Sequence, residues 1–240
     1  MRSGNPVLTN DTFNEVRSYD SGHVMSIQGT TNKSFILLFL VMLTAIWAWS
    51  NPGGASPFLL PALVGGFLTA LVTVFKKEWS PITAPLYALL EGVVLGTVSV
   101  IFEQSYPGIV KQAVGLTGAT LCALLIVYRS GMITVTDQFR MGIVAATGGI
   151  ALYYLLTLVL GFFQVRMPLI YDSGPIGIGF SLIVVIIAAL NLVLDFDFIE
   201  QGSRMGVPKY MEWYGAFGLM VTLIWLYMEI LRFLSKLRRR

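Results

Sequence analysis

Seven long apolar runs, joined by short polar connections, decide what this chain can fold into. Each run is close to the ~20 residues that a helix needs to cross the hydrocarbon of a bilayer. Only 12% of the 240 residues are charged and the mean hydropathy is +0.74, whereas a soluble domain carries about a quarter charged residues. We therefore predict an all-α polytopic membrane protein, a seven-transmembrane-helix bundle. The runs are 34–50, 58–75, 82–102, 109–128, 141–163, 176–198 and 211–233.

The domain organisation follows from these runs. We expect a polar N-terminal arm over residues 1–33, a transmembrane domain over 34–234 and a basic tail over 235–240. The tail suits an anionic membrane surface. Nucleic-acid binding is disfavoured, because no basic face with interleaved aromatic residues extends through a soluble region. The lipid bilayer is the expected partner.

Basic residues set the expected orientation, because cytoplasmic loops of membrane proteins are enriched in Lys and Arg. A cytosolic N-terminus puts most loop cations inside and leaves only Lys111 and Arg166 outside. Seven crossings then leave the basic tail outside, whereas a re-entrant last run would return it to the cytosol. Short C-terminal tails can be exceptions to this rule, so we favour seven crossings. The cations placed inside are Arg2, Arg17, Lys33, Lys76, Lys77, Arg129, Arg140, Arg204 and Lys209.

Several kinds of chemistry are disfavoured by composition. Cys122 is the only cysteine and His23 the only histidine, so neither a disulfide nor a Cys or His metal cluster is expected. An intramembrane aspartyl protease would need a Gly-x-Gly-Asp motif, and Gly177-Ile-Gly-Phe180 lacks the Asp. We expect a protein that is not an enzyme and holds no cofactor.

Acids within the apolar runs carry the functional signal, since intramembrane carboxylates are costly and usually mark ion or proton paths. Glu91 lies ~14 Å into its run by helical rise. It either hydrogen-bonds a neighbouring helix in neutral form or lines an ion path, for which Asp197 is a second candidate. Glycines spaced four residues apart from small residues, Gly92 with Gly96 and Gly115 with Ala119, predict close helix contacts.

Asp195 and Glu212 stand at similar distances from the centre of the loop 201–209. In antiparallel neighbouring helices they would share a depth and could meet. Two carboxyls in contact share a proton, and their oxygens suit Ca²⁺. The alternative is a solvated acidic helix end. Near the other end of the last run, Glu229 precedes Arg232 by three residues, a spacing that permits an ion pair.

Three segments resemble the Bax inhibitor-1 family, and its bacterial branch most. They are Pro81-Ile-Thr-Ala-Pro-Leu-Tyr-Ala-Leu-Leu-Glu-Gly92, Leu190-Asn-Leu-Val-Leu-Asp-Phe-Asp-Phe-Ile-Glu200 and Lys209-Tyr-Met-Glu-Trp-Tyr-Gly-Ala-Phe-Gly218. The resemblance implies a seven-helix bundle with a central last helix and a pH-sensitive Ca²⁺ leak. It also implies an Asp pair, one from each of the last two spans, as the pH sensor. Asp195 matches the first of these, and Glu212 takes the place of the second.

The function expected from the residues and the resemblance together is a pH-gated calcium or cation leak channel of the bacterial inner membrane. Asp195 and Glu212 would form the proton sensor and the calcium ligands, closed when they share a proton and opened as pH rises. Two alternatives remain open. One is a non-conducting regulator of proteases or stress responses with a membrane-protein partner, and the other is a proton-coupled solute transporter.

Overall fold

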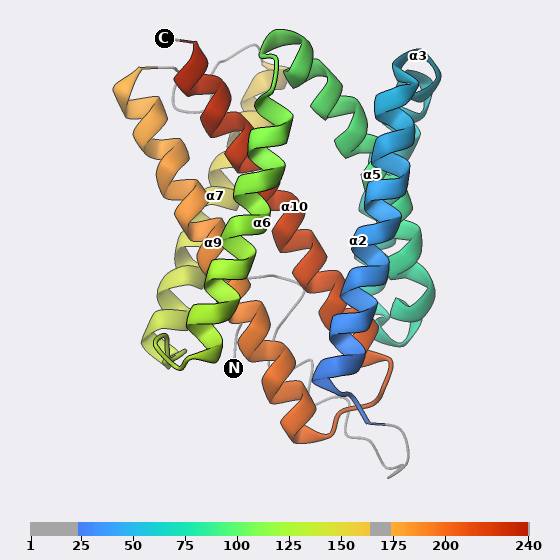
Figure 1. Ribbon diagram of the computed structural model, residues 1–240, viewed down its shortest axis with the longest axis vertical. Helices are drawn as coiled ribbons and strands as arrows, with labels where there is room; N and C mark the ends of the chain where they lie inside the picture. The colour runs from blue at the N-terminus through green and yellow to red at the C-terminus, as the bar shows by residue number, and fades with distance from the viewer. Residues whose placement is uncertain (1–23, 164–173, 240) are drawn as a thin grey trace. The chain divides into compact units, whose positions relative to one another are not determined.

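A computed structural model describes residues 24–163 and 174–239, and every regular element in these ranges is helical (Figure 1). A single isolated antiparallel bridge joins Val24 to Pro208. The elements are α2 (Ile27–Ser50), α3 (Pro52–Ala55), η1 (Ser56–Phe58), α4 (Leu59–Phe75), η2 (Lys77–Trp79), α5 (Ser80–Ser105), α6 (Ile109–Arg129), α7 (Asp137–Phe162), α9 (Pro175–Met205) and α10 (Met211–Arg238).

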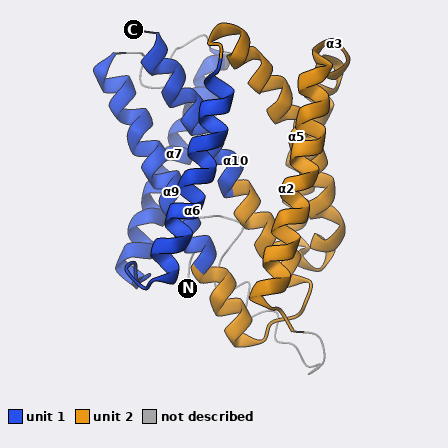
Figure 2. Ribbon diagram, in the orientation of Figure 1, with its two compact units in different colours: residues 1–9, 108–196, 222–240 blue, residues 10–107, 197–221 orange. Residues whose placement is uncertain are grey.

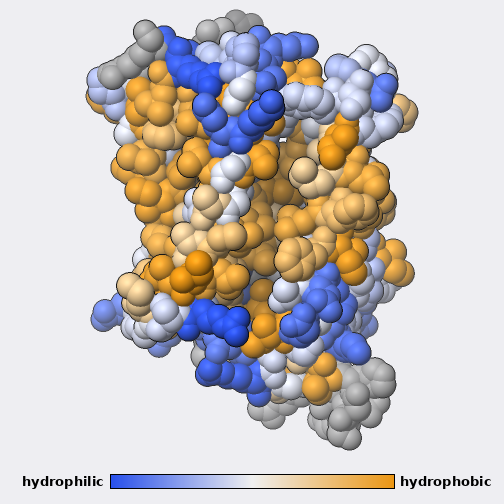
Figure 3. Space-filling model, viewed as in Figure 1, coloured by the Kyte–Doolittle hydropathy of each residue, from blue (hydrophilic) through white to orange (hydrophobic). Residues whose placement is uncertain are grey.

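Seven helical stretches among the described residues are long and apolar enough to cross a membrane, which confirms the predicted all-α class. Apolar side chains cover the middle of the helices, and polar ones gather at the helix ends (Figure 3). The stretch in α10 is half buried, a larger share than in any other described span, so the last helix is covered by protein to a greater extent than the other six. The short elements α3 and η1 continue into α4, and η2 continues into α5.

The first span begins earlier than its hydropathy predicts. Helix α2 begins at Ile27 rather than at residue 34, so the expected arm of residues 1–33 ends inside a helix, and its residues 1–23 lie outside the described ranges. Ser26 caps the helix by accepting a hydrogen bond from the Gly29 N–H at 2.9 Å. The first two turns are mostly polar and are stabilised by this cap, and for that reason hydropathy alone places the start of the span too late.

Gly206 ends α9 and turns the chain toward α10. It adopts a left-handed φ of 64°, a conformation that glycine adopts without a Cβ penalty. The N–H of the next residue, Val207, bonds back to the Gly202 carbonyl at 3.4 Å. This is the pattern of a glycine-terminated helix end, and it fixes a short loop, 206–210, between the last two spans.

Helices α2 and α5 pack with their backbones close together at Gly92 and Gly96. A Cβ at Gly92 would lie 2.4 Å from the Val41 carbonyl oxygen, and one at Gly96 would lie 2.4 Å from that of Ala45. The predicted contact at these two glycines is confirmed. The contact predicted at Gly115 is wrong, since no atom of residues 24–163 or 174–239 lies within 4 Å of a Cβ built there.

The described residues divide into two compact units (Figure 2). Unit 1 contains α6, α7, the part of α9 up to Phe196 and the part of α10 from Thr222. Unit 2 contains α2 to α5, the rest of α9 from Asp197 and the start of α10 up to Val221. Asp195 therefore belongs to unit 1, and Glu212 belongs to unit 2.

Candidate functional site

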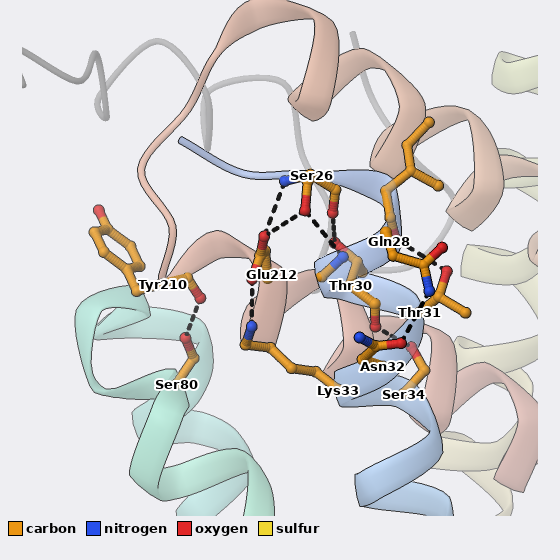
Figure 4. Close-up of polar contacts among 12 residues, drawn as sticks. Ser26, Gln28, Thr30, Thr31, Asn32, Lys33, Ser34, Ser80, Tyr210 and Glu212 are labelled. Carbon is orange, nitrogen blue, oxygen red and sulfur yellow. Dashed lines mark hydrogen bonds and ion pairs between the residues drawn. The ribbon is translucent and has the colours of Figure 1, made fainter. Parts of the chain in front are cut away.

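Glu212, the second residue of α10, is held by the start of α2 within unit 2 (Figure 4). Its side chain is only 2% exposed. Oε1 accepts hydrogen bonds from the backbone N–H and the hydroxyl of Ser26, both at 2.9 Å. Oε2 forms an ion pair with the Lys33 ammonium. The carboxylate thus joins the first span to the last through three contacts, and we call Ser26, Gly29, Lys33 and Glu212 the Glu212 cluster.

The start of α2 is built to accept a carboxylate. The first N–H groups of a helix lack intrahelical partners and carry the positive end of the helix dipole, so they favour an anion. Gly29 leaves room for it, because a Cβ there would lie 2.1 Å from Glu212 Oε1. The Ser26 hydroxyl accepts from the Gly29 N–H and donates to Glu212, so it links the helix cap to the carboxylate.

Lys33 supplies the charge that balances Glu212. Its side chain is 17% exposed, and its ammonium lies 5.6 Å from the centroid of the Trp213 ring, within the range of a cation–π contact. Partial burial strengthens such an ion pair relative to one in bulk water. From the sequence, Lys33 indicates only the orientation of the chain, because spacing along the chain gives no sign of its partner.

The loop before α10 is tied to two further elements of unit 2. The Met25 N–H donates to the Val207 carbonyl at 2.7 Å. The Ser80 hydroxyl at the start of α5 donates to the Tyr210 carbonyl at 3.0 Å. Burial, followed by the nearby charge of Glu78, raises the pKa of Tyr210 to about 12. The beginnings of α2, α5 and α10 therefore meet around the Glu212 cluster.

The predicted partner of Glu212, Asp195, is fully buried in unit 1, with 0% exposure. The shared proton and the shared calcium ion of this pair remain predictions. Both Glu212 oxygens already have partners in unit 2. Asp197, a candidate for the ion path, lies in unit 2, is partly buried and accepts a hydrogen bond from the Gln201 amide at 2.7 Å. In the described ranges no group of three or more His, Cys, Asp or Glu side chains could hold a metal.

Glu91 lies in the interior of unit 2, on α5. The hydroxyl of Tyr87, one turn earlier, hydrogen-bonds its carboxyl group. A Cβ on Gly66 of α4 would lie 3.5 Å from Glu91 Oε2, so the carboxyl group packs against that helix. The Tyr87 ring in turn packs edge-on against Phe217 of α10, with centroids 5.1 Å apart. Both readings of Glu91, a structural hydrogen bond and an ion path, are compatible with this environment.

The ion pair predicted between Glu229 and Arg232 is present in unit 1, at 2.8 Å. Glu229 is 1% exposed and also accepts hydrogen bonds from the Tyr154 hydroxyl at 2.9 Å and the Trp225 indole at 3.2 Å. Arg232 donates to the same Tyr154 hydroxyl and lies over its ring. This cluster ties α7 to α10, and both carboxylate oxygens of Glu229 accept hydrogen bonds, which indicates a structural role.

The family model described as Bax inhibitor 1 like matches residues 5–239, nearly the whole chain. The chain belongs to the Bax inhibitor 1 like family. No curated protein and no solved structure matches it. The family match covers all seven spans and both acids of the predicted sensor, and it confirms the resemblance to the family; the bacterial branch remains a prediction.

Proposed function

We propose that this protein lets cations, Ca²⁺ foremost, leak slowly across the bacterial inner membrane, and that protonation of Glu212 controls the rate. The observation that carries the proposal is the Glu212 cluster, in which one buried carboxylate ties the first span to the last. The oxygen chemistry of Asp195 suits Ca²⁺, and the resemblance to Bax inhibitor-1 proteins implies a pH-sensitive Ca²⁺ leak.

The tie has a built-in response to pH. An ionised Glu212 attracts Lys33 and accepts from the Ser26 N–H and hydroxyl. Protonation removes the negative charge, so the attraction to Lys33 and to the helix dipole of α2 is lost. Tyr210, in the loop before α10, stays neutral up to a high pH because burial and the charge of Glu78 raise its pKa, and Lys209 beside it adds a positive charge to this loop. Acidification should therefore loosen the start of α10 from α2.

The two possible sensors predict opposite responses of the cation flux to pH. A proton shared between Asp195 and Glu212 would close the path in acid and open it as pH rises. The tie to Lys33 is strongest when Glu212 is ionised, so flux should rise as pH falls. We propose the second arrangement, because Lys33 and Ser26 contact Glu212 directly.

A flux assay tests the proposal. The purified full-length protein is placed in liposomes that contain a Ca²⁺ indicator, and influx is followed from acid to alkaline pH. We expect flux that increases toward acid, a high and pH-independent flux in Glu212→Gln, and reduced flux in Asp195→Asn. Glu200→Gln is the matched control. Glu200 lies on α9, outside the Glu212 cluster, and pairs with the exposed Arg204 of the same helix.

Two results would overturn the proposal. One is a flux no greater than that of empty liposomes, and capture of a stable membrane-protein partner would then favour the non-conducting regulator. The other is an unchanged pH profile in Glu212→Gln, which would remove Glu212 from the gate. A flux that rises with pH, and that both acid variants abolish, would restore the shared-proton pair.

A further inference from the structure

One face of α9 carries polar side chains into the interior of unit 1. From Gly177 to Asn191 the buried positions of α9 are spaced alternately four and three residues apart, which places them on a single helical face. Exposed residues such as Ile183 and Ile186 lie between them. The buried positions on this face are Gly177, Ser181, Val184, Ala188, Asn191 and Asp195, and from Leu192 to Phe196 every position of α9 is buried. Half of this inward face is therefore able to hydrogen-bond or to bind an ion, although the helix is otherwise strongly apolar.

Asn191 has a fixed orientation on this face. It is 1% exposed, and its amide nitrogen donates to the Thr147 hydroxyl at 2.9 Å and to the Ile187 carbonyl at 2.8 Å. A backbone carbonyl only accepts, so the NH₂ group must point toward Ile187. A flipped amide would place Oδ1 against the Ile187 carbonyl, two acceptors in contact, so Oδ1 is held on the side away from Ile187.

The oxygen of that amide has no hydrogen-bond partner among the described residues, although it is fully buried. Leaving a buried polar atom without a partner costs about 1–3 kcal/mol. A leucine of similar size would avoid the cost, so an asparagine at this position calls for a ligand. The ligand must be a hydrogen-bond donor or a cation, because an amide oxygen only accepts.

Asp195 lies one helical turn further along the same face and is 0% exposed. Residues four apart on a helix have Cβ atoms ~5–6 Å apart, a spacing that one ion can bridge. A carboxylate and an amide oxygen are the hard ligands that Ca²⁺ takes in proteins. A cation at this point would join the contacts that Asp195 already makes, and its charge would reduce the cost of burying a carboxylate.

We propose that Asn191 Oδ1 and the Asp195 carboxylate bind the permeating cation, with Ca²⁺ as the preferred ion and part of its water shell retained. This inference rests on the proposed cation leak and names a binding step on its path. Two protein ligands are few for Ca²⁺, so the affinity should be low, in the range of about 10⁻⁴–10⁻³ M found for weak calcium sites. Weak binding is what conduction requires, because the ion must also leave.

Binding is tested without any flux measurement. The full-length protein is placed in nanodiscs of zwitterionic lipid, and its thermal unfolding is followed as CaCl₂ replaces choline chloride at constant ionic strength. We expect the Tm to rise with Ca²⁺ by mass action. Asn191→Leu should abolish the rise or weaken the apparent affinity about tenfold or more, the size of effect known for groups around metal ligands. Asn191→Asp should strengthen it.

Two control variants separate binding from packing. Thr147→Val removes the tether of the amide but leaves Oδ1 in place, so it should lower the Tm and keep the Ca²⁺-dependent rise. Ser181→Ala, on the same buried face, should also keep it. The inference is overturned if the wild type shows no Ca²⁺-dependent rise, which would mean that Oδ1 contacts water only. It is equally overturned if Asn191→Leu keeps the full rise, or if Ser181→Ala loses it as well. A Ca²⁺-dependent rise in a protein that carries no flux would leave the binding site standing and refute the proposed leak.

Discussion

Glu212 shows how one side chain can depend on partners far away in the chain. It is 186 residues from Ser26 and 179 from Lys33, yet it contacts both. Its surroundings combine a helix start, a cation and a glycine that makes room. Each of these favours a negative charge at the beginning of α10. The cluster is therefore sensitive to small changes in any of its members.

At Gly29, substitution by alanine should displace the Glu212 carboxylate. The new Cβ would lie 2.1 Å from Oε1, and overpacking of this kind typically costs about 1–3 kcal/mol. We expect a lower Tm in Gly29→Ala, measured by thermal unfolding in detergent, and a flux that no longer responds to pH. Gly115→Ala is the control, because nothing lies within 4 Å of a Cβ at Gly115. Equal Tm values in the two variants would contradict the packing at Gly29.

The Tyr210 hydroxyl should titrate late. Burial and the charge of Glu78 raise its pKa to about 12, above the ordinary value of about 10. Since the folded state binds this proton more tightly, the resulting stability is complete below pH ~10 and is lost as pH rises through ~12. Phenolate absorbance, taken as the difference between the wild type and Tyr210→Phe, should appear near pH 12. A difference signal centred at pH 10 would show that Tyr210 is solvated.

At the scale of elements, local residues set where the helices begin and end, and tertiary packing sets which helices touch. Capping by Ser26 and the left-handed Gly206 set where α2 begins and where α9 ends. Gly92 and Gly96 let α2 and α5 approach closely, whereas the similar motif at Gly115 faces open space. The spacing of small residues therefore predicts that a helix can pack closely, and only the arrangement of helices decides whether it does.

The contact between α2 and α5 should be lost when Gly96 is enlarged. In Gly96→Ala the new methyl group would lie 2.4 Å from the Ala45 carbonyl oxygen and 2.8 Å from the Ala48 Cβ. The backbones of α2 and α5 must move apart to relieve these clashes, which disturbs the packing along the contact. We therefore expect a destabilisation of about 1–3 kcal/mol. Reversible unfolding in mixed micelles measures it. The corresponding change at Gly118, where nothing lies within 4 Å, should have little effect, and similar losses in both variants would contradict the packing.

For the whole molecule, the seven spans and the basic residues at their ends predict an orientation. Among the described residues, the cations that the sequence places inside lie in the first turns of α2, at the junction of α4 and α5, at the end of α6, in the first turn of α7, and at the end of α9 and in the loop after it. An odd number of crossings puts the two ends of the chain on opposite sides of the membrane. We therefore propose a cytosolic N-terminus and an external C-terminal tail. Both proposals rest only on the basic residues and the number of crossings.

Cysteine labelling tests the orientation. In a Cys122→Ser background, Ser21→Cys should react with a membrane-impermeant maleimide only in inside-out vesicles. Leu237→Cys, at an exposed position near the end of α10, should react only in intact spheroplasts, because seven crossings place it outside. Labelling of both positions from the cytosolic side would instead support a re-entrant last run.

The number of spans, their approximate limits and the all-α class follow from the sequence alone, because apolar runs of membrane length have few other ways to fold. So does the Glu229–Arg232 pair, which is local to one helix turn. The partners of Glu212 and the fixed amide of Asn191 were decided only by the tertiary structure. Each joins helices from distant parts of the chain, and which faces meet depends on packing that spacing along one helix does not encode.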